Sequence, residues 1–144
     1  MKCSVSISIA CPLETVFDFV SNYENDPLWR AGVFSMKQEP AWPSEIGTKT
    51  WEVARFFGKT SKNYGEVVRY EPGHVIAFAG VMPDGTSVAG DRTVERVDNQ
   101  TRFTYRATVE LSGFLLLLAP IIAALLTRRF SADLQRLKKH LEAV

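Results

Sequence analysis

Hydrophobic and polar residues alternate along much of this chain of 144 residues, a pattern typical of β-strands that bury one face. The alternation is strict over residues 3–9 and predicts the first strand. Over residues 13–20 the apolar positions recur at spacings of three and four, which predicts a short helix. A second short helix is expected around residues 27–30, before Gly32. The chain is therefore expected to open with a strand and two short helices.

The region after residue 33 contains four turn signals: Gly58-Lys59, Pro72-Gly73, Asp84-Gly85 and Asn99-Gln100. They predict a meander of about six strands. If each signal is a two-residue hairpin loop, the register is fixed and one largely apolar face runs through the five strands that they connect. Val67, Ile76 and Phe78 fall on the opposite face. A single β-bulge would exchange the two faces for the residues that follow the bulge.

The end of the chain reads as one long helix. Thirteen apolar residues, 114–126, run directly into a basic amphipathic stretch. One helix of this kind can cover the apolar face of a whole sheet. The predicted fold is therefore α+β, a single domain over residues 1–144, with a curved antiparallel sheet of about seven strands, two short helices and a long C-terminal helix across the concave face.

Composition and charge narrow the classes of function. The formal net charge is +1, which provides no overall field for gathering nucleic acid, so no nucleic-acid partner is expected. The N-terminus lacks the continuous apolar core of a signal peptide, which favours a cytoplasmic location. The apolar run 114–126 would be about 20 Å long as a helix, too short for the roughly 30 Å hydrocarbon core of a bilayer. We therefore expect no transmembrane segment, while peripheral membrane contact through the basic helix stays open.

Small residues in the middle of the predicted inward face leave room for a cavity beneath the helix. The expected lining comprises Trp51, Tyr64, Ala77, Ala79, Gly90, Tyr105 and Ala107 from the sheet, with Leu117 and Ile121 from the helix. An apolar cavity with an aromatic rim is the usual form of a small-molecule site. The alternative is that side chains of the helix fill this space.

Two charged residues, Glu66 and Arg92, interrupt the predicted inward face. They would flank the strand of Ala77 and Ala79 and could meet above it. In a functional interpretation Arg92 anchors a carboxylate or enolate and Glu66 acts as a general base, which makes them the candidate catalytic residues. In a structural interpretation they form an ion pair, or a bulge turns one of them outward.

Signatures of other chemistries are missing from the sequence. The two histidines and two cysteines have no recognisable metal-ligand spacing, so no metal site is expected. No nucleophile elbow, P-loop or dinucleotide-binding glycine motif occurs, and no cofactor is expected.

Several short strings support a resemblance that covers the whole chain. They include PLETVFDFV at 12–20, GT at 47–48, YEP at 70–72 and TRFTY at 101–105, followed by Gly113 and Pro120. In order and spacing they resemble the START-related SRPBCC superfamily with the helix-grip fold, often labelled polyketide cyclase/dehydrase and lipid transport. The resemblance implies a cavity between sheet and C-terminal helix that holds lipids, polyketides or related molecules, and no shared catalytic motif.

Three functions follow as hypotheses. The first is binding or carriage of a small hydrophobic ligand of lipid, polyketide, aromatic or isoprenoid type. The second is a cyclase or dehydratase, a lyase-type enzyme without a metal, and the third is a membrane-surface or protein-interaction module that uses the basic helix. We favour the non-catalytic binder. The oligomeric state is not indicated by the sequence.

Overall fold

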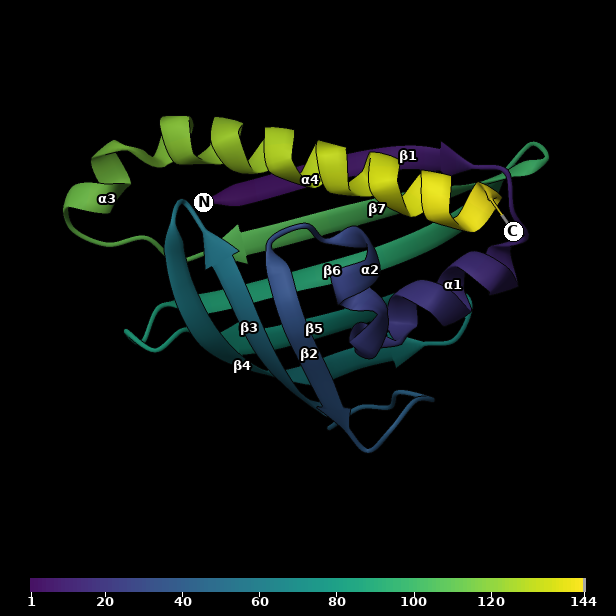
Figure 1. Ribbon diagram of the computed structural model, residues 1–144, viewed down its shortest axis with the longest axis horizontal. Helices are drawn as coiled ribbons and strands as arrows, with labels where there is room; N and C mark the ends of the chain where they lie inside the picture. Colours follow the sequence, from purple (N-terminus) through teal and green to yellow (C-terminus); the bar gives the residue numbers. More distant parts are fainter. Residues whose placement is uncertain (144) are drawn as a thin grey trace.

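The computed structural model describes residues 1–143, which form a curved sheet whose concave side is covered by helices (Figure 1). Along the chain the elements are β1 (Lys2–Ile9), α1 (Leu13–Ser21), the 3-10 helix η1 (Tyr23–Asn25), α2 (Asp26–Trp29), β2 (Val33–Glu39), β3 (Lys49–Phe56), β4 (Lys59–Glu71), β5 (Val75–Val81), β6 (Ser87–Val97), β7 (Gln100–Val109), α3 (Phe114–Leu117) and α4 (Ala119–Glu142).

The sheet has seven strands in the order β1-β7-β6-β5-β4-β3-β2, and every neighbouring pair is antiparallel. Helix α4 packs along β1, and α2 contacts both α4 and β2 (Figure 1). The helices therefore close the concave side of the sheet. This arrangement confirms the predicted α+β class, with its strand, short helices, meander and C-terminal helix.

The C-terminal helix is not continuous as predicted. Helix α3 ends at Leu117, and α4 begins at Ala119 after Leu118 leaves the helical region, with φ −96° and ψ 1°. Pro120 explains the break, because it has no N–H to donate to the Leu116 carbonyl and its ring would clash with that carbonyl, whereas proline is tolerated in the first turn of α4. In Figure 1 α3 projects beyond the end of α4, away from the sheet.

The predicted register is wrong at three connections, and at one of them the error reverses a face. The β5–β6 loop contains the five residues 82–86, whereas a two-residue loop was predicted. An odd number of loop residues exchanges the faces, so Ala77 pairs with Asp91 and Ile76 pairs with Arg92. The first and last hairpins are each two residues out of the predicted register, which keeps the faces: Trp51 pairs with Tyr64, and Val94 with Phe103.

As a result, the strands β3 to β5 turn the opposite face inward from the one predicted. Val67 and Ile76, which were the apolar exceptions, are buried on the concave side. Trp51, Tyr64 and Glu66 lie on the convex side and are exposed. For β6 and β7 the predicted inward face is confirmed, because Arg92 and Tyr105 are buried opposite each other.

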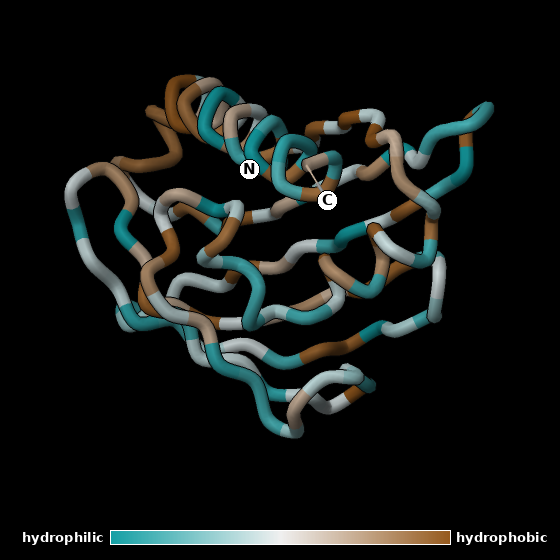
Figure 2. Tube along the Cα trace, turned by 45° about the vertical axis from the view of Figure 1, so that its right-hand side comes forward, coloured by the Kyte–Doolittle hydropathy of each residue, from teal (hydrophilic) through white to brown (hydrophobic). Residues whose placement is uncertain are grey.

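The core is concentrated under the C-terminal half of α4. Phe130, Leu134, Leu137 and Leu141 recur at spacings of three and four and are buried against the sheet. The ring of Trp29 fills the space beneath them and meets Phe103 and Tyr105 edge-on, with centroids 6.0 Å and 5.9 Å away. Figure 2 shows that the other end of the same region, α3 and the first turns of α4, is strongly hydrophobic. That end has no comparable cover.

Candidate functional site

A cavity of about 590 Å³ lies between the concave face of the sheet and the N-terminal half of α4. Its walls are mostly apolar, and they include Met36, Phe56, Phe78, Val88, Ala107, Val109, Ile122, Leu126 and Phe130. The small side chain of Ala107 and the exposed start of α4 leave this space unfilled, whereas bulky residues of α4 fill the corresponding space further along the helix. Its size and apolar walls are those of a small-molecule site.

The inner end of the cavity is formed by an ion pair that reaches from β6 to α2. Arg92 binds Asp26 through two hydrogen bonds, from Nη1 to Oδ1 at 2.8 Å and from Nη2 to Oδ2 at 2.6 Å. Nη1 also donates to the Val20 carbonyl at 2.9 Å. Both charged side chains are fully buried. A bidentate pair of this kind fixes both side chains in place.

A second pair extends the cluster toward β3. Arg30 donates from Nη1 to Asp26 at 2.9 Å and to Glu52 at 2.8 Å, and Asn63 of β4 donates to Glu52 at 2.9 Å. Two cations and two anions therefore balance within the cluster. Because the charges compensate, the cluster can lie in the interior without a counter-ion.

Aromatic rings surround the buried guanidinium of Arg92. The rings of Tyr23, Trp29 and Tyr105 have their centroids 4.4 Å, 5.2 Å and 5.5 Å from its central carbon. Burial alone would lower the pKa of Arg92, but the Asp26 carboxylate together with Tyr23 and Tyr105 outweighs burial, and the pKa is raised. Arg92 is therefore a permanent cation in this position.

Several polar atoms at this end have no hydrogen-bond partner among the described residues. They include Tyr23 Oη, Arg30 Nε and Asn63 Oδ1, and all three residues line the cavity. Burial raises the pKa of Tyr23, so its hydroxyl stays protonated and can donate a hydrogen bond. Buried polar atoms normally have partners, and a hydroxyl or carbonyl group of a bound molecule would supply them.

The structure brings together only part of the predicted site. Of the predicted lining residues, Arg92, Tyr105 and Ala107 line the cavity from the concave face, while Tyr64 borders it from a strand position whose side chain lies on the convex side. Gly90 lies on the concave face, where the Phe78 ring covers it. The prediction of an inward position is wrong for Trp51, Tyr64, Glu66, Ala77 and Ala79, whose side chains lie on the convex face, and for Ile121, which is 60% exposed on α4. Leu117 is also misplaced, since it is 79% exposed on α3.

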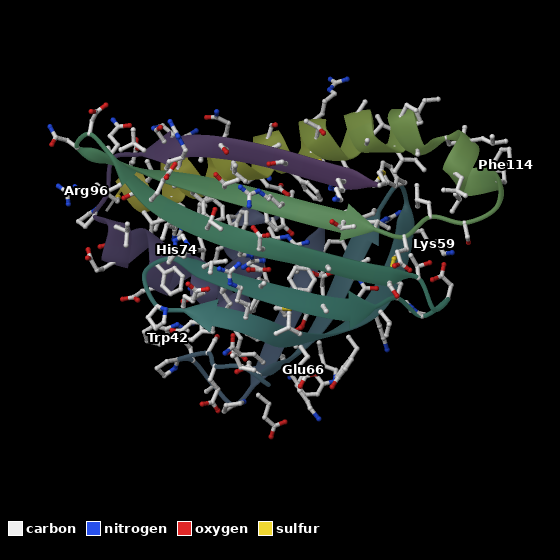
Figure 3. The ribbon with its side chains drawn as sticks, turned by 180° about the vertical axis from the view of Figure 1, so that it is seen from behind. Trp42, Lys59, Glu66, His74, Arg96 and Phe114 are labelled. Atoms are coloured by element: carbon white, nitrogen blue, oxygen red, sulfur yellow. The ribbon has the colours of Figure 1, made fainter. Side chains whose placement is uncertain are left out.

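The predicted Glu66/Arg92 pair does not form. Glu66 is exposed on the convex face opposite Ala79, and the partner of Arg92 is Asp26. The five-residue β5–β6 loop is the cause, because it places Glu66 and Arg92 on opposite faces of the sheet. Figure 3, which labels Glu66, shows its side chain outside the sheet. Glu66 therefore cannot act in the cavity together with Arg92.

Sequence reasoning missed five residues that form the polar end: Tyr23, Asp26, Arg30, Glu52 and Asn63. Glu52 and Asn63 were placed outward by the reversed face of β3 and β4. The apolar exceptions Ile76 and Phe78 were the signal that could have corrected that face. Tyr23 and Arg30 follow the first helix and the second, respectively, where no periodic pattern indicates burial.

Among the described residues, no helix has the length and apolarity needed to cross a membrane.

Comparisons with known proteins place this geometry in a wider group. A family model described as "Polyketide cyclase / dehydrase and lipid transport" matches residues 1–142. No curated protein sequence matches the chain. Among solved structures, a protein from Thermus thermophilus is similar with a TM-score of 0.81 at 19% identity, over 99% of this chain and 98% of that one.

Two further solved structures carry informative descriptions. A START superfamily protein from Mycobacterium smegmatis has a TM-score of 0.78 at 14% identity, covering 99% of this chain and 97% of its own. The ZhuI aromatase/cyclase from a Streptomyces species has a TM-score of 0.75 at 13% identity, covering 99% and 93%. At these identities the likeness establishes the shared fold alone.

Proposed function

The chain belongs to the polyketide cyclase/dehydrase and lipid transport family, and from that premise we propose that it binds a small, mostly apolar ligand in the cavity beneath α4. One observation carries the proposal. A space of about 590 Å³ has apolar walls and ends at buried polar atoms without partners. A packed core would leave neither the space nor the unpaired atoms.

The chemistry of the walls indicates the kind of ligand. An apolar body would lie against Phe78, Val88 and Leu126, while a hydroxyl or carbonyl group at the inner end would accept a hydrogen bond from Tyr23, and a hydroxyl could also donate to Asn63. A carboxylate is a poorer fit, because the charges of Arg92 and Arg30 are already balanced by Asp26 and Glu52. Phenols, ketones and alcohols with a large apolar part are therefore the expected class, which includes polyketide-like and isoprenoid molecules.

The alternative of a cyclase or dehydratase uses Glu66 as the general base and Arg92 as the anchor of a carboxylate or enolate, and of these two only Arg92 lines the cavity. Since Glu66 is exposed on the convex face, that mechanism has lost its base. Asp26 and Glu52 are the carboxylates at the inner end, and both are engaged with arginines. We therefore keep binding or carriage as the proposed function.

A neutral fluorescent probe, N-phenyl-1-naphthylamine, tests the proposal because its emission rises in apolar sites. Ala107→Phe fills the cavity from β7, and Ala79→Phe makes the same change on the convex face as a matched control. We expect one probe per chain with the wild type and with Ala79→Phe, and at least tenfold weaker binding to Ala107→Phe. Equal binding by two folded variants would show that the probe does not occupy the cavity.

A further inference from the structure

One end of the molecule exposes large apolar side chains that nothing covers. This surface, called the apolar tip below, comprises Phe57 at the β3–β4 turn with Phe114, Leu115, Leu116, Leu117 and Ile121 of α3 and α4. Phe114 is 71% exposed, Leu117 79% and Phe57 59%. Scattered exposed leucines are ordinary, but a contiguous apolar patch usually marks an interaction surface.

The composition of the tip differs from the rest of the surface. No charged residue occurs between Glu110 and Arg128. Helix α3 packs mainly against α4, and most of its apolar side chains are exposed. Phe57 has a positive φ of 53°, a rare conformation for a bulky residue, and its ring is exposed. The apolar tip is thus contributed by two separate segments of the chain.

The apolar tip surrounds the mouth of the cavity. Phe57 and Leu115 belong both to the tip and to the cavity wall, and Met82 and Pro83 of the β5–β6 loop complete the rim. Figure 3 labels Phe114 and Lys59 at the same end of the molecule, with Glu66 and Trp42 away from it. A ligand that leaves the cavity by this mouth would emerge into whatever the tip contacts.

The charges beside the tip are mainly positive. Within the segments 55–62, 82–86 and 109–129 there are five cations and two anions. The cations are Arg55, Lys59, Lys62, Arg128 and Arg129, and the anions are Asp84 and Glu110. An excess of cations in the segments next to an apolar surface is complementary to a bilayer that contains anionic lipids.

We propose that the apolar tip docks onto the surface of a bilayer containing anionic lipids, with the mouth of the cavity facing the lipid. Phe57, Phe114 and Leu117 insert among the acyl chains near the headgroups, and the basic residues contact phosphates. An apolar ligand can then move between bilayer and cavity without crossing water. This last step rests on the proposed function, but docking itself does not. A second copy of this chain or a protein partner would fit an apolar patch but gives no role to the cations.

Co-sedimentation with vesicles tests docking with a matched control. The wild type should pellet with vesicles of phosphatidylcholine and phosphatidylglycerol in a 7:3 ratio, and more weakly with phosphatidylcholine alone. The double variant Phe114→Ser, Leu117→Ser should bind at least tenfold more weakly. The control Phe34→Ser, Ile46→Ser removes two residues of similar exposure, 60% and 66%, outside the tip and should bind as the wild type does.

A second pair of measurements separates the outcomes. Lys62→Gln with Arg128→Gln should weaken binding to the anionic vesicles and reduce its dependence on salt. Neither these residues nor Phe114 and Leu117 line the cavity, so all variants should bind N-phenyl-1-naphthylamine as the wild type does. Failure of docking with intact probe binding would overturn this inference alone.

Two further results would also overturn docking on a bilayer. One is wild-type protein that stays in the supernatant with both kinds of vesicle. The other is a concentration-dependent dimer in sedimentation velocity that is lost in the Phe114→Ser, Leu117→Ser variant, because it would assign the apolar tip to a second copy of the chain.

Discussion

The two ends of the cavity differ in almost every physical property. At the inner end, Arg92, Asp26 and Arg30 are buried, hydrogen-bonded and surrounded by aromatic rings. At the mouth, Phe114 and Leu117 are exposed and contact little. The inner end therefore stabilises the fold and sets the polarity of the ligand, while the mouth contributes little to stability and is available for exchange. Substitutions at the two ends should separate these roles.

The largest loss of stability is expected when Asp26, the carboxylate shared by Arg92 and Arg30, loses its charge. Asp26→Asn leaves Arg92 and Arg30 as buried cations with one carboxylate between them. Removing one partner of a buried ion pair lowers the free energy of unfolding by about 3–5 kcal/mol. Urea denaturation followed by circular dichroism measures this loss.

The control for that variant is Glu95→Gln, which breaks the exposed Arg102–Glu95 pair. Pairs of that kind contribute less than about 1 kcal/mol. If Asp26→Asn were as mild as Glu95→Gln, the buried cluster would not be the stabilising end of the molecule.

Alkaline pH should destabilise the inner end through Tyr23. Burial raises the pKa of Tyr23 in the folded protein above the ordinary 10.0. Above pH 10 the unfolded chain therefore loses a proton that the folded chain keeps, and this residue lowers stability by about 1.4 kcal/mol per pH unit. Below pH 10 its contribution is constant. The free energy of unfolding of the wild type and of Tyr23→Phe can be compared between about pH 8 and pH 11. The pH dependence should differ between the two proteins only at the alkaline end. The same pH dependence in both would contradict a buried Tyr23 hydroxyl.

The Tyr23 hydroxyl should also determine how tightly ligands with a polar group bind. Tyr23→Phe removes the donor but keeps the ring beside Arg92, so the fold should be unaffected at neutral pH. We expect 2-naphthol to lose about tenfold in affinity, since one hydrogen bond is worth about 1–1.5 kcal/mol. Its counterpart 2-methylnaphthalene, with a methyl in place of the hydroxyl, should bind both proteins equally. Displacement of N-phenyl-1-naphthylamine measures both ligands, and equal losses for the two would mean that the polar end plays no part.

The smallest effect on stability is expected at the mouth. Leu117→Ala should change the free energy of unfolding by less than about 0.5 kcal/mol, as is usual for exposed positions. The matched change Leu137→Ala, at a fully buried position in the other half of the C-terminal region, should lower it by about 2–5 kcal/mol. Thermal or urea unfolding of the two variants compares them directly. A large loss in Leu117→Ala would show that α3 is part of the core.

Much of the fold was predictable because its signals are local. Alternation over residues 3–9, helical spacing over 13–20 and the turn signals after residue 33 predicted the order of the elements, and the structure confirms that order. The break between α3 and α4 was also accessible, since Pro120 is incompatible with an uninterrupted helix. It was missed because the apolar run was interpreted as one surface.

The site was less predictable because it depends on the length of one loop. Asp84-Gly85 is a strong turn signal, but it does not distinguish a two-residue loop from the five residues 82–86. That difference moved Trp51, Glu66, Ala77 and Ala79 to the convex face. The partnership of Arg92 with Asp26 joins residues 66 positions apart, and no local pattern indicates it.

The central claim is that the cavity under α4 holds an apolar ligand, and native mass spectrometry of protein saturated with N-phenyl-1-naphthylamine tests it most directly. We predict one bound probe per chain in the wild type and in Ala79→Phe, and markedly lower occupancy in Ala107→Phe at the same probe concentration. The same occupancy in all three proteins, or an empty wild type at saturating probe, would contradict the account.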